Sequence, residues 1–81
     1  MSASAPEPAA LRDAARHVVA VLVRQAGVAQ LAAVEDAVQG ALALGLERWP
    51  GEGPPRDLRA WLYRVAQRRL QDGRRKGARR R

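Results

Sequence analysis

Apolar residues recur every three or four positions between residues 9 and 27, which is the spacing of one face of an α-helix. Pro8 suits the first turn of such a helix, and Gly27 suits its end. The polar residues of the segment fall largely on the opposite face. The pattern predicts an amphipathic surface helix, with a buried stripe of Leu11, Ala15, Val18 and Leu22 flanked by Val19 and Ala26.

A second helical pattern starts between Val28 and Val34, without a good N-cap residue, and runs to Trp49. Gly40 and Gly45 lie inside it, and each costs about 1 kcal/mol relative to alanine in a helix interior. We therefore expect another helix to approach closely at these positions. The predicted inward face comprises Val34, Ala37, Val38, Ala41, Leu42, Gly45 and Trp49.

The segment WPGEGPP (Trp49–Pro55) holds three prolines and two glycines in seven residues, which predicts a compact loop that ends both neighbouring helices. Asp57 is a suitable N-cap for a third helix, and Gly73 a suitable stop. Trp61 and Tyr63 point about 200° apart on an ideal helix, so we expect only Trp61 to join the core. The predicted stripe is Leu58, Trp61, Leu62, Val65 and Leu70.

These patterns contain no strand and no internal repeat, so they predict an all-α fold: a compact three-helix bundle with a Pro/Gly loop between the second and third helices. We expect a disordered tail at residues 1–8, a helical domain at 9–73, and a basic tail or the start of an interdomain linker at 74–81. A chain of 81 residues makes one domain and buries only about 60% of its unfolded surface, so the core is small.

Composition adds expectations about the compartment. The chain has no cysteine, which fits a reducing environment. Its longest strongly apolar run, Val18–Val23, is six residues, far short of the roughly 20 that span a bilayer. The N-terminus MSASAPEPAA lacks the basic start and apolar stretch of a signal peptide. We expect a cytoplasmic protein that does not engage a membrane.

The charge is segregated along the chain. Residues 1–55 carry four basic groups against six acids, whereas residues 56–81 carry eleven against two, which accounts for the net charge of +7. Such asymmetry attracts a polyanion to one side of the molecule, so nucleic acid is the leading partner. The terminal RRKGARRR is too self-repulsive to pack alone, and we expect it to order on phosphate.

No catalytic constellation can be assembled from this sequence. His17 is the only imidazole, and PGEGPP lacks the Lys-Ser/Thr ending of a phosphate-binding loop. We therefore expect neither an enzyme nor a bound cofactor or metal ion.

Two stretches carry a family resemblance: VEDAVQGAL leading to LERWP (Val34–Pro50) and AWLYRVAQRRLQD (Ala60–Asp72). In order and spacing they resemble region 2 of bacterial extracytoplasmic-function (ECF) sigma factors, over roughly residues 10–76. The resemblance implies a sigma region 2-like bundle without catalysis of its own. Such a domain docks on the clamp helices of the RNA polymerase β′ subunit and engages the non-template strand of the promoter −10 element as it melts.

The resemblance places polymerase docking on Glu35, Asp36 and Gln39, with Gly40 where the family has Glu. Glu47 also lies away from the apolar stripe of the second helix. Together they form an acidic and amide surface that a basic partner helix can pair with. The alternative is a merely solvated helix face.

The DNA-binding candidates are residues that can contact phosphates or bases: Arg56, Arg59, Tyr63, Arg64, Gln67, Arg68, Gln71, Arg74, Arg75 and Lys76. In the family, the loop before the third helix and an Asn form a pocket for an extruded base. Here that pocket maps to the Trp49–Leu58 loop, with Trp49, Glu52 and Gly53, and to Arg68. Because guanidinium only donates hydrogen bonds, Arg68 in place of Asn should alter or abolish base preference.

Several alternatives stay open. Tyr63 either stacks on a base or is simply partly exposed, and Trp49 either closes the core or lines the base pocket. The whole chain could instead be a sequence-independent nucleic-acid scaffold that binds phosphate. It could also be a sigma-like interaction protein that holds polymerase, or occupies an anti-sigma factor, without opening promoters.

Overall fold

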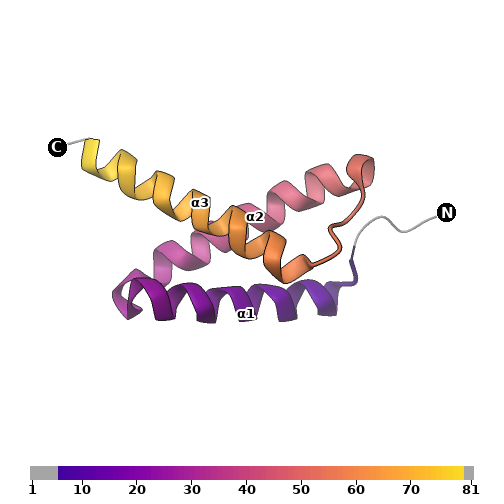
Figure 1. Cartoon of the computed structure of the whole chain (residues 1–81), viewed down its shortest axis with the longest axis horizontal. Helices are drawn as coiled ribbons and strands as arrows, with labels where there is room; N and C mark the ends of the chain where they lie inside the picture. Colours follow the sequence, from indigo (N-terminus) through magenta and orange to yellow (C-terminus); the bar gives the residue numbers. More distant parts are fainter. Residues whose placement is uncertain (1–5, 80–81) are drawn as a thin grey trace.

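The computed structural model describes residues 6–79, with side chains described through residue 73. It consists of α1 (Pro8–Ala26), a single 3-10 turn η1 (Val28–Gln30), α2 (Leu31–Glu52) and α3 (Leu58–Arg79). Figure 1 shows α1 along one side of the molecule, with α2 and α3 crossing each other above it. Each helix packs on the other two. The prediction of an all-α, three-helix fold is confirmed; residues 1–5 of the predicted N-terminal tail lie outside the described residues.

Helix α1 begins at Pro8 as predicted and ends at Gly27, whose N–H donates to the Val23 carbonyl at 2.7 Å. Gly27 has φ +102°, in the left-handed region that favours glycine. The fully buried row is Ala14, Val18 and Leu22, so Ala14 takes the place predicted for Ala15, which is half-buried. The buried stripe is thus shifted by one residue at this turn, because α1 packs against two helices.

The predicted inward face of α2 is confirmed except for Leu42, which is half-buried, but the predicted end of the helix is wrong. The helix continues through Trp49, Pro50 and Gly51 to Glu52. The indole of Trp49 is only 2% exposed and lies against the ring of Trp61, with centroids 5.2 Å apart. Burial of this ring stabilises a last turn that Pro50 would otherwise disfavour through its missing N–H.

Gly53 terminates α2 with φ +86°, and its N–H donates to the Trp49 carbonyl at 2.7 Å. The connection to α3 is therefore residues 53–57. Its last residue is the predicted N-cap: Asp57 Oδ1 accepts a hydrogen bond from the Ala60 N–H at 3.1 Å.

Helix α3 does not stop at Gly73 but continues to Arg79. A glycine weakens a helix by about 1 kcal/mol without ending it, unless the chain needs a left-handed residue there. The prediction of a stop at Gly73 is wrong. The predicted basic tail falls on residues whose side chains lie outside the described residues.

The arc of α3 that packs against the core is wider than the sequence suggests. Leu62, Ala66 and Leu70 are buried. Trp61 and Tyr63 both pack against this core while staying half-buried. Our expectation that only Trp61 would do so is wrong, because α3 crosses both other helices and each aromatic residue covers one edge of the contact.

A side chain at each of the two interior glycines of α2 would meet a different neighbour. A Cβ on Gly40 would lie 2.7 Å from Cζ of Arg69, so the end of an α3 side chain occupies that space. A Cβ on Gly45 would lie 2.6 Å from Cη2 of Trp49 in the same helix. The expected approach from another helix is thus met at Gly40 by a side chain, and the expectation is wrong at Gly45.

These contacts predict opposite effects of two alanine substitutions. Gly45→Ala forces the new methyl group against a buried indole, which costs about 1–3 kcal/mol of strain against about 1 kcal/mol of gained helix propensity. We expect a net loss of about 1 kcal/mol in the free energy of unfolding, measured by urea denaturation. Gly40→Ala is the matched control, because it displaces only a flexible side-chain end and should be neutral or stabilising. Equal stabilisation by both variants would contradict this packing.

Candidate functional site

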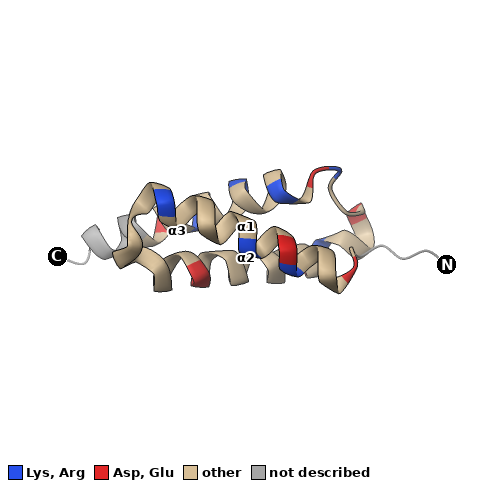
Figure 2. Cartoon of the chain, turned by 90° about the horizontal axis from the view of Figure 1, so that it is seen from below, with Lys and Arg blue, Asp and Glu red and all other residues tan. Residues whose placement is uncertain are grey.

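The outer face of α2 carries the predicted docking residues. Four acidic residues lie on this helix (Figure 2): Glu35, Asp36, Glu47 and Glu52. Glu35, Asp36 and Gln39 are exposed on successive turns, so none of them is part of the core. Glu47 is exposed too, eleven residues after Asp36, or about 16 Å along the axis at 1.5 Å per residue. We call Glu35, Asp36, Gln39 and Glu47 the acidic face.

An apolar groove runs along one side of the acidic face, between α1 and α2. Gln39, Leu42 and Leu46 line it from α2, and Leu11 and Ala15 from α1, with Arg12 and Arg16 of α1 at its edge. Leu46 is 51% exposed, unusually much for a large apolar side chain. Leu46 lies outside the inward stripe that the sequence predicts, and a leucine at such a position was a usable signal for this groove.

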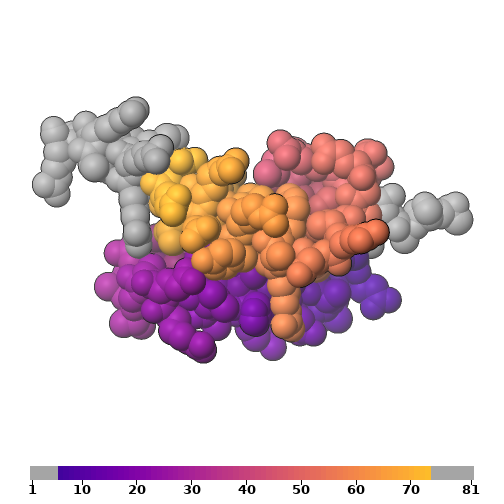
Figure 3. Space-filling model, viewed as in Figure 1, coloured from indigo at the N-terminus to yellow at the C-terminus, as the bar shows by residue number. Residues whose placement is uncertain are grey.

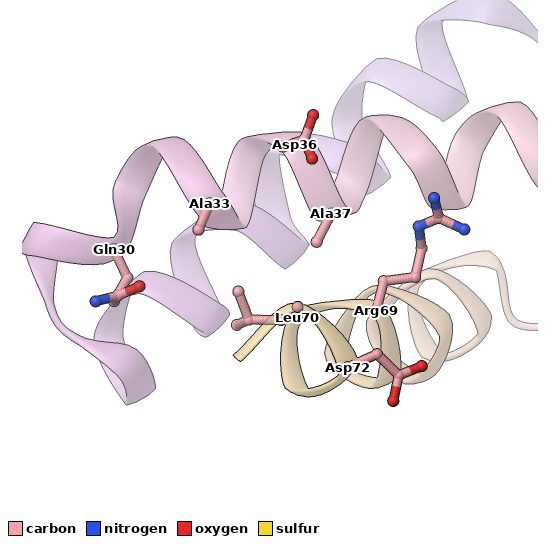
Figure 4. A pocket seen from close by; sticks show the side chains of 8 residues that line it. Gln30, Ala33, Asp36, Ala37, Arg69, Leu70 and Asp72 are labelled. Atoms are coloured by element: carbon pink, nitrogen blue, oxygen red, sulfur yellow. The ribbon is translucent and has the colours of Figure 1, made fainter. Parts of the chain in front are cut away.

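A second, charged groove runs along the other side, between α2 and α3 (Figure 4). Gln30, Ala33 and Asp36 line it from the N-terminal half of α2 and the turn before it, and Arg69, Leu70 and Asp72 from α3. In Figure 4 the side chain of Arg69 reaches toward α2, whereas Asp72 points away from it. The acidic face is therefore bordered by an arginine from the basic helix, an approach that helical periodicity alone does not predict.

Helix α3 forms the middle of the surface seen in Figure 3. Its outer side carries Arg64 and Arg68, which we call the basic face. Arg64 and Arg68 are exposed, and each follows a buried residue of the helix by two positions, or about 200°. Gln71 is exposed on the same side, and Arg56 and Arg59 are exposed at the start of the helix. Arg74, Arg75 and Lys76 have side chains outside the described residues.

Tyr63 and Gln67 lie at the edge of α3 that meets α1. The Tyr63 hydroxyl donates to Gln25 Oε1 at 3.0 Å and accepts from Gln67 Nε2 at 3.0 Å. Both residues are half-buried. The hydroxyl and one amide proton are thus engaged within the protein, and this arrangement favours a partly exposed structural tyrosine over a free stacking platform.

The residues assigned to a base-pocket loop do not share one loop. Trp49 is buried inside α2, so of its two open roles the structure supports core closure. Glu52 is the exposed last residue of α2, and only Gly53 belongs to the connection. Arg68 remains exposed on α3.

Within the part of the chain that the structure describes, no three metal-ligating side chains come together. In the same residues, no helix has the length and apolar character to traverse a bilayer.

The fold and the two faces define a small helical binding domain, acidic on one helix and basic on another. The chain belongs to the sigma-70 region 2 family, whose model matches residues 11–80. It therefore has the role of a sigma factor region 2, in RNA polymerase binding and promoter recognition. This confirms the resemblance at the level of sigma region 2. No match to a curated protein or to a solved structure was found.

Proposed function

We propose that this chain is the region 2 domain of an ECF sigma factor. It docks on the β′ clamp helices of RNA polymerase through the acidic face and holds the melted non-template −10 strand on the basic face. The observation that supports this most directly is the exposure of Glu35, Asp36 and Gln39 on α2, apart from the outer arginines of α3. The domain is a cytoplasmic binding module without catalysis or cofactor.

Charge and hydrogen-bonding chemistry support the assignment of polymerase docking to α2 and DNA binding to α3. Carboxylates and an amide on successive turns accept charge-assisted hydrogen bonds from a basic partner helix. The exposed guanidinium groups of Arg64 and Arg68 suit phosphates, which fix the register of a strand without reading its sequence. A strand held this way stays parted while polymerase is bound through a different helix.

The function is tested by two binding measurements on the same protein. The first titrates single-stranded non-template −10 oligonucleotides in which each base is changed in turn. The second measures capture of the β′ clamp helices. We expect clamp binding and unequal oligonucleotide affinities; absence of clamp binding would overturn the docking role, and equal affinity for every oligonucleotide would overturn specific base readout.

Arg68 gives a prediction about base preference. An asparagine presents a donor and an acceptor to a base edge, whereas the guanidinium only donates. Arg68→Asn should therefore sharpen base discrimination at one position, by about 1 kcal/mol or more if the new contact is bidentate, and lower overall affinity through the lost charge. Oligonucleotide titrations measure both effects, with Arg64→Asn as the matched control that should only lower affinity. An unchanged preference profile would tell against a base pocket at Arg68.

A second candidate function is a sigma-like interaction protein that holds polymerase or an anti-sigma factor without opening promoters. It is favoured by Arg68 in place of Asn and by Gly40 in place of Glu. Its signature is clamp or anti-sigma binding without any strand-selective DNA contact.

A further inference from the structure

We propose that Arg69 of α3 completes the docking surface of α2, so that the partner segment carries an acidic side chain opposite Gly40, beside the basic groups that face Glu35 and Asp36. This inference rests on the proposed docking function and specifies the partner's chemistry. The docking surface is then a mixed-charge surface contributed by two helices.

The contact between Arg69 and Gly40 carries the proposal. Gly40 lies one turn after Asp36 on α2, and a Cβ there would lie 2.7 Å from both Cζ and Nη2 of Arg69. The guanidinium thus occupies the space of a side chain at position 40, which only glycine leaves open. Figure 4 shows this side chain reaching from α3 to α2.

Arg69 differs in direction from Arg64 and Arg68, the two exposed arginines that precede it on α3. It follows the buried Leu62 by seven residues, which is two helical turns less about 20°. Arg69 therefore leaves α3 on nearly the same side as Leu62, the side that faces the other helices. Arg68 and Arg64 point to the outer side instead. The guanidinium of Arg69 therefore lies at the surface of α2, although the backbone of Arg69 is part of α3.

The chemistry of guanidinium sets what it can bind. Arginine has five N–H donors and no acceptor, and it stays charged, so its best partner is a carboxylate held in a bidentate pair. Arg69 is exposed and can meet such a group. A uniformly basic partner helix would be repelled at this point, whereas one with an acid beside its basic groups, at about one-turn spacing, would match the charges. Arg69 thereby selects among partners.

The test measures the affinity of the full chain for the isolated β′ clamp-helix hairpin, and separately for a single-stranded −10 oligonucleotide. Arg69→Glu should weaken clamp binding by about 10-fold or more, and Arg69→Ala by less. The matched control is Arg68→Glu, which changes the neighbouring residue by the same charge and should spare clamp binding while weakening the oligonucleotide. Circular dichroism verifies that each variant is folded.

Two further variants identify the mechanism. Gly40→Ala keeps every charge but displaces the guanidinium, so it should weaken clamp binding a few-fold. Reversing the acidic residues of the hairpin to lysine, one at a time, should restore the affinity of Arg69→Glu at one position. Failure of every reversal to restore it overturns the proposal, and so does a loss of oligonucleotide binding without loss of clamp binding, which would assign Arg69 to DNA.

The outcomes separate this inference from the proposed function. If Asp36→Arg abolishes clamp binding while Arg69→Glu binds like the wild type, the docking role stands and the role of Arg69 is refuted. If the wild-type chain does not bind the hairpin, both are refuted.

Discussion

Replacing Trp49 by alanine is expected to lower the free energy of unfolding by about 3–5 kcal/mol and to lower the melting temperature strongly. The indole is 2% exposed and packs against Trp61 at 5.2 Å, and truncating a buried Trp costs about 3–5 kcal/mol. A chain of 81 residues has a total stability of only about 4–12 kcal/mol at 0.05–0.15 kcal/mol per residue. The substitution therefore removes a large part of the stability, and thermal denaturation followed by circular dichroism measures the loss.

The matched control is Trp61→Ala, which truncates the half-buried partner of the same ring pair and should cost less. Trp49→Phe keeps an aromatic ring in the core and should retain the fold. It also tests the role that the structure disfavours: if Trp49→Phe folds normally yet loses affinity for a single-stranded oligonucleotide, the indole contacts a base after all. Equal, small losses of stability in both alanine variants would contradict the placement of Trp49 at the centre of the packing.

The number of helices and most of their buried faces could be predicted from the sequence, because apolar periodicity indicates which side of a helix is buried. Every predicted residue of the inward face of α2 except the half-buried Leu42 is buried, and the Asp57 cap was found from its side chain alone. Two of the errors arose because tertiary contacts overrode local propensity. Burial of Trp49 carries α2 through Pro50, and the crossing of α3 over two helices brings Tyr63 to the core.

The features of the candidate site that lie on one helix could be predicted from the sequence, whereas those that join two helices could not. Exposure of Glu35, Asp36 and Gln39 follows from their positions on one helix, so the sequence could predict it. The approach of Arg69 to Gly40 and the apolar groove around Leu46 join residues from different helices. Helical periodicity states which side of α3 faces the core but not which neighbour it meets, so these features required the arrangement of all three helices.

Asp36→Arg is expected to remove binding to the β′ clamp helices while sparing DNA. Asp36 is exposed on α2 and borders the groove that contains Arg69. Reversing its charge deletes one acceptor and places two guanidinium groups beside each other before a basic partner. Loss of a charge pair at an interface costs about 2–5 kcal/mol, and 1.4 kcal/mol is a tenfold change in affinity, so we expect at least about 30-fold weaker capture.

The matched control is Asp13→Arg, which makes the same charge change at an exposed position of α1 that lies outside the acidic face and its two grooves. Both variants raise the net charge equally, so only a local docking effect separates their clamp affinities. If Asp36→Arg and Asp13→Arg capture the clamp helices as well as the wild type does, the docking role assigned to Asp36 is wrong. The carboxylate of Asp36 would then be merely solvated, and the polymerase contact would have to be sought elsewhere, first in the groove between α1 and α2 that Gln39 and Leu46 line.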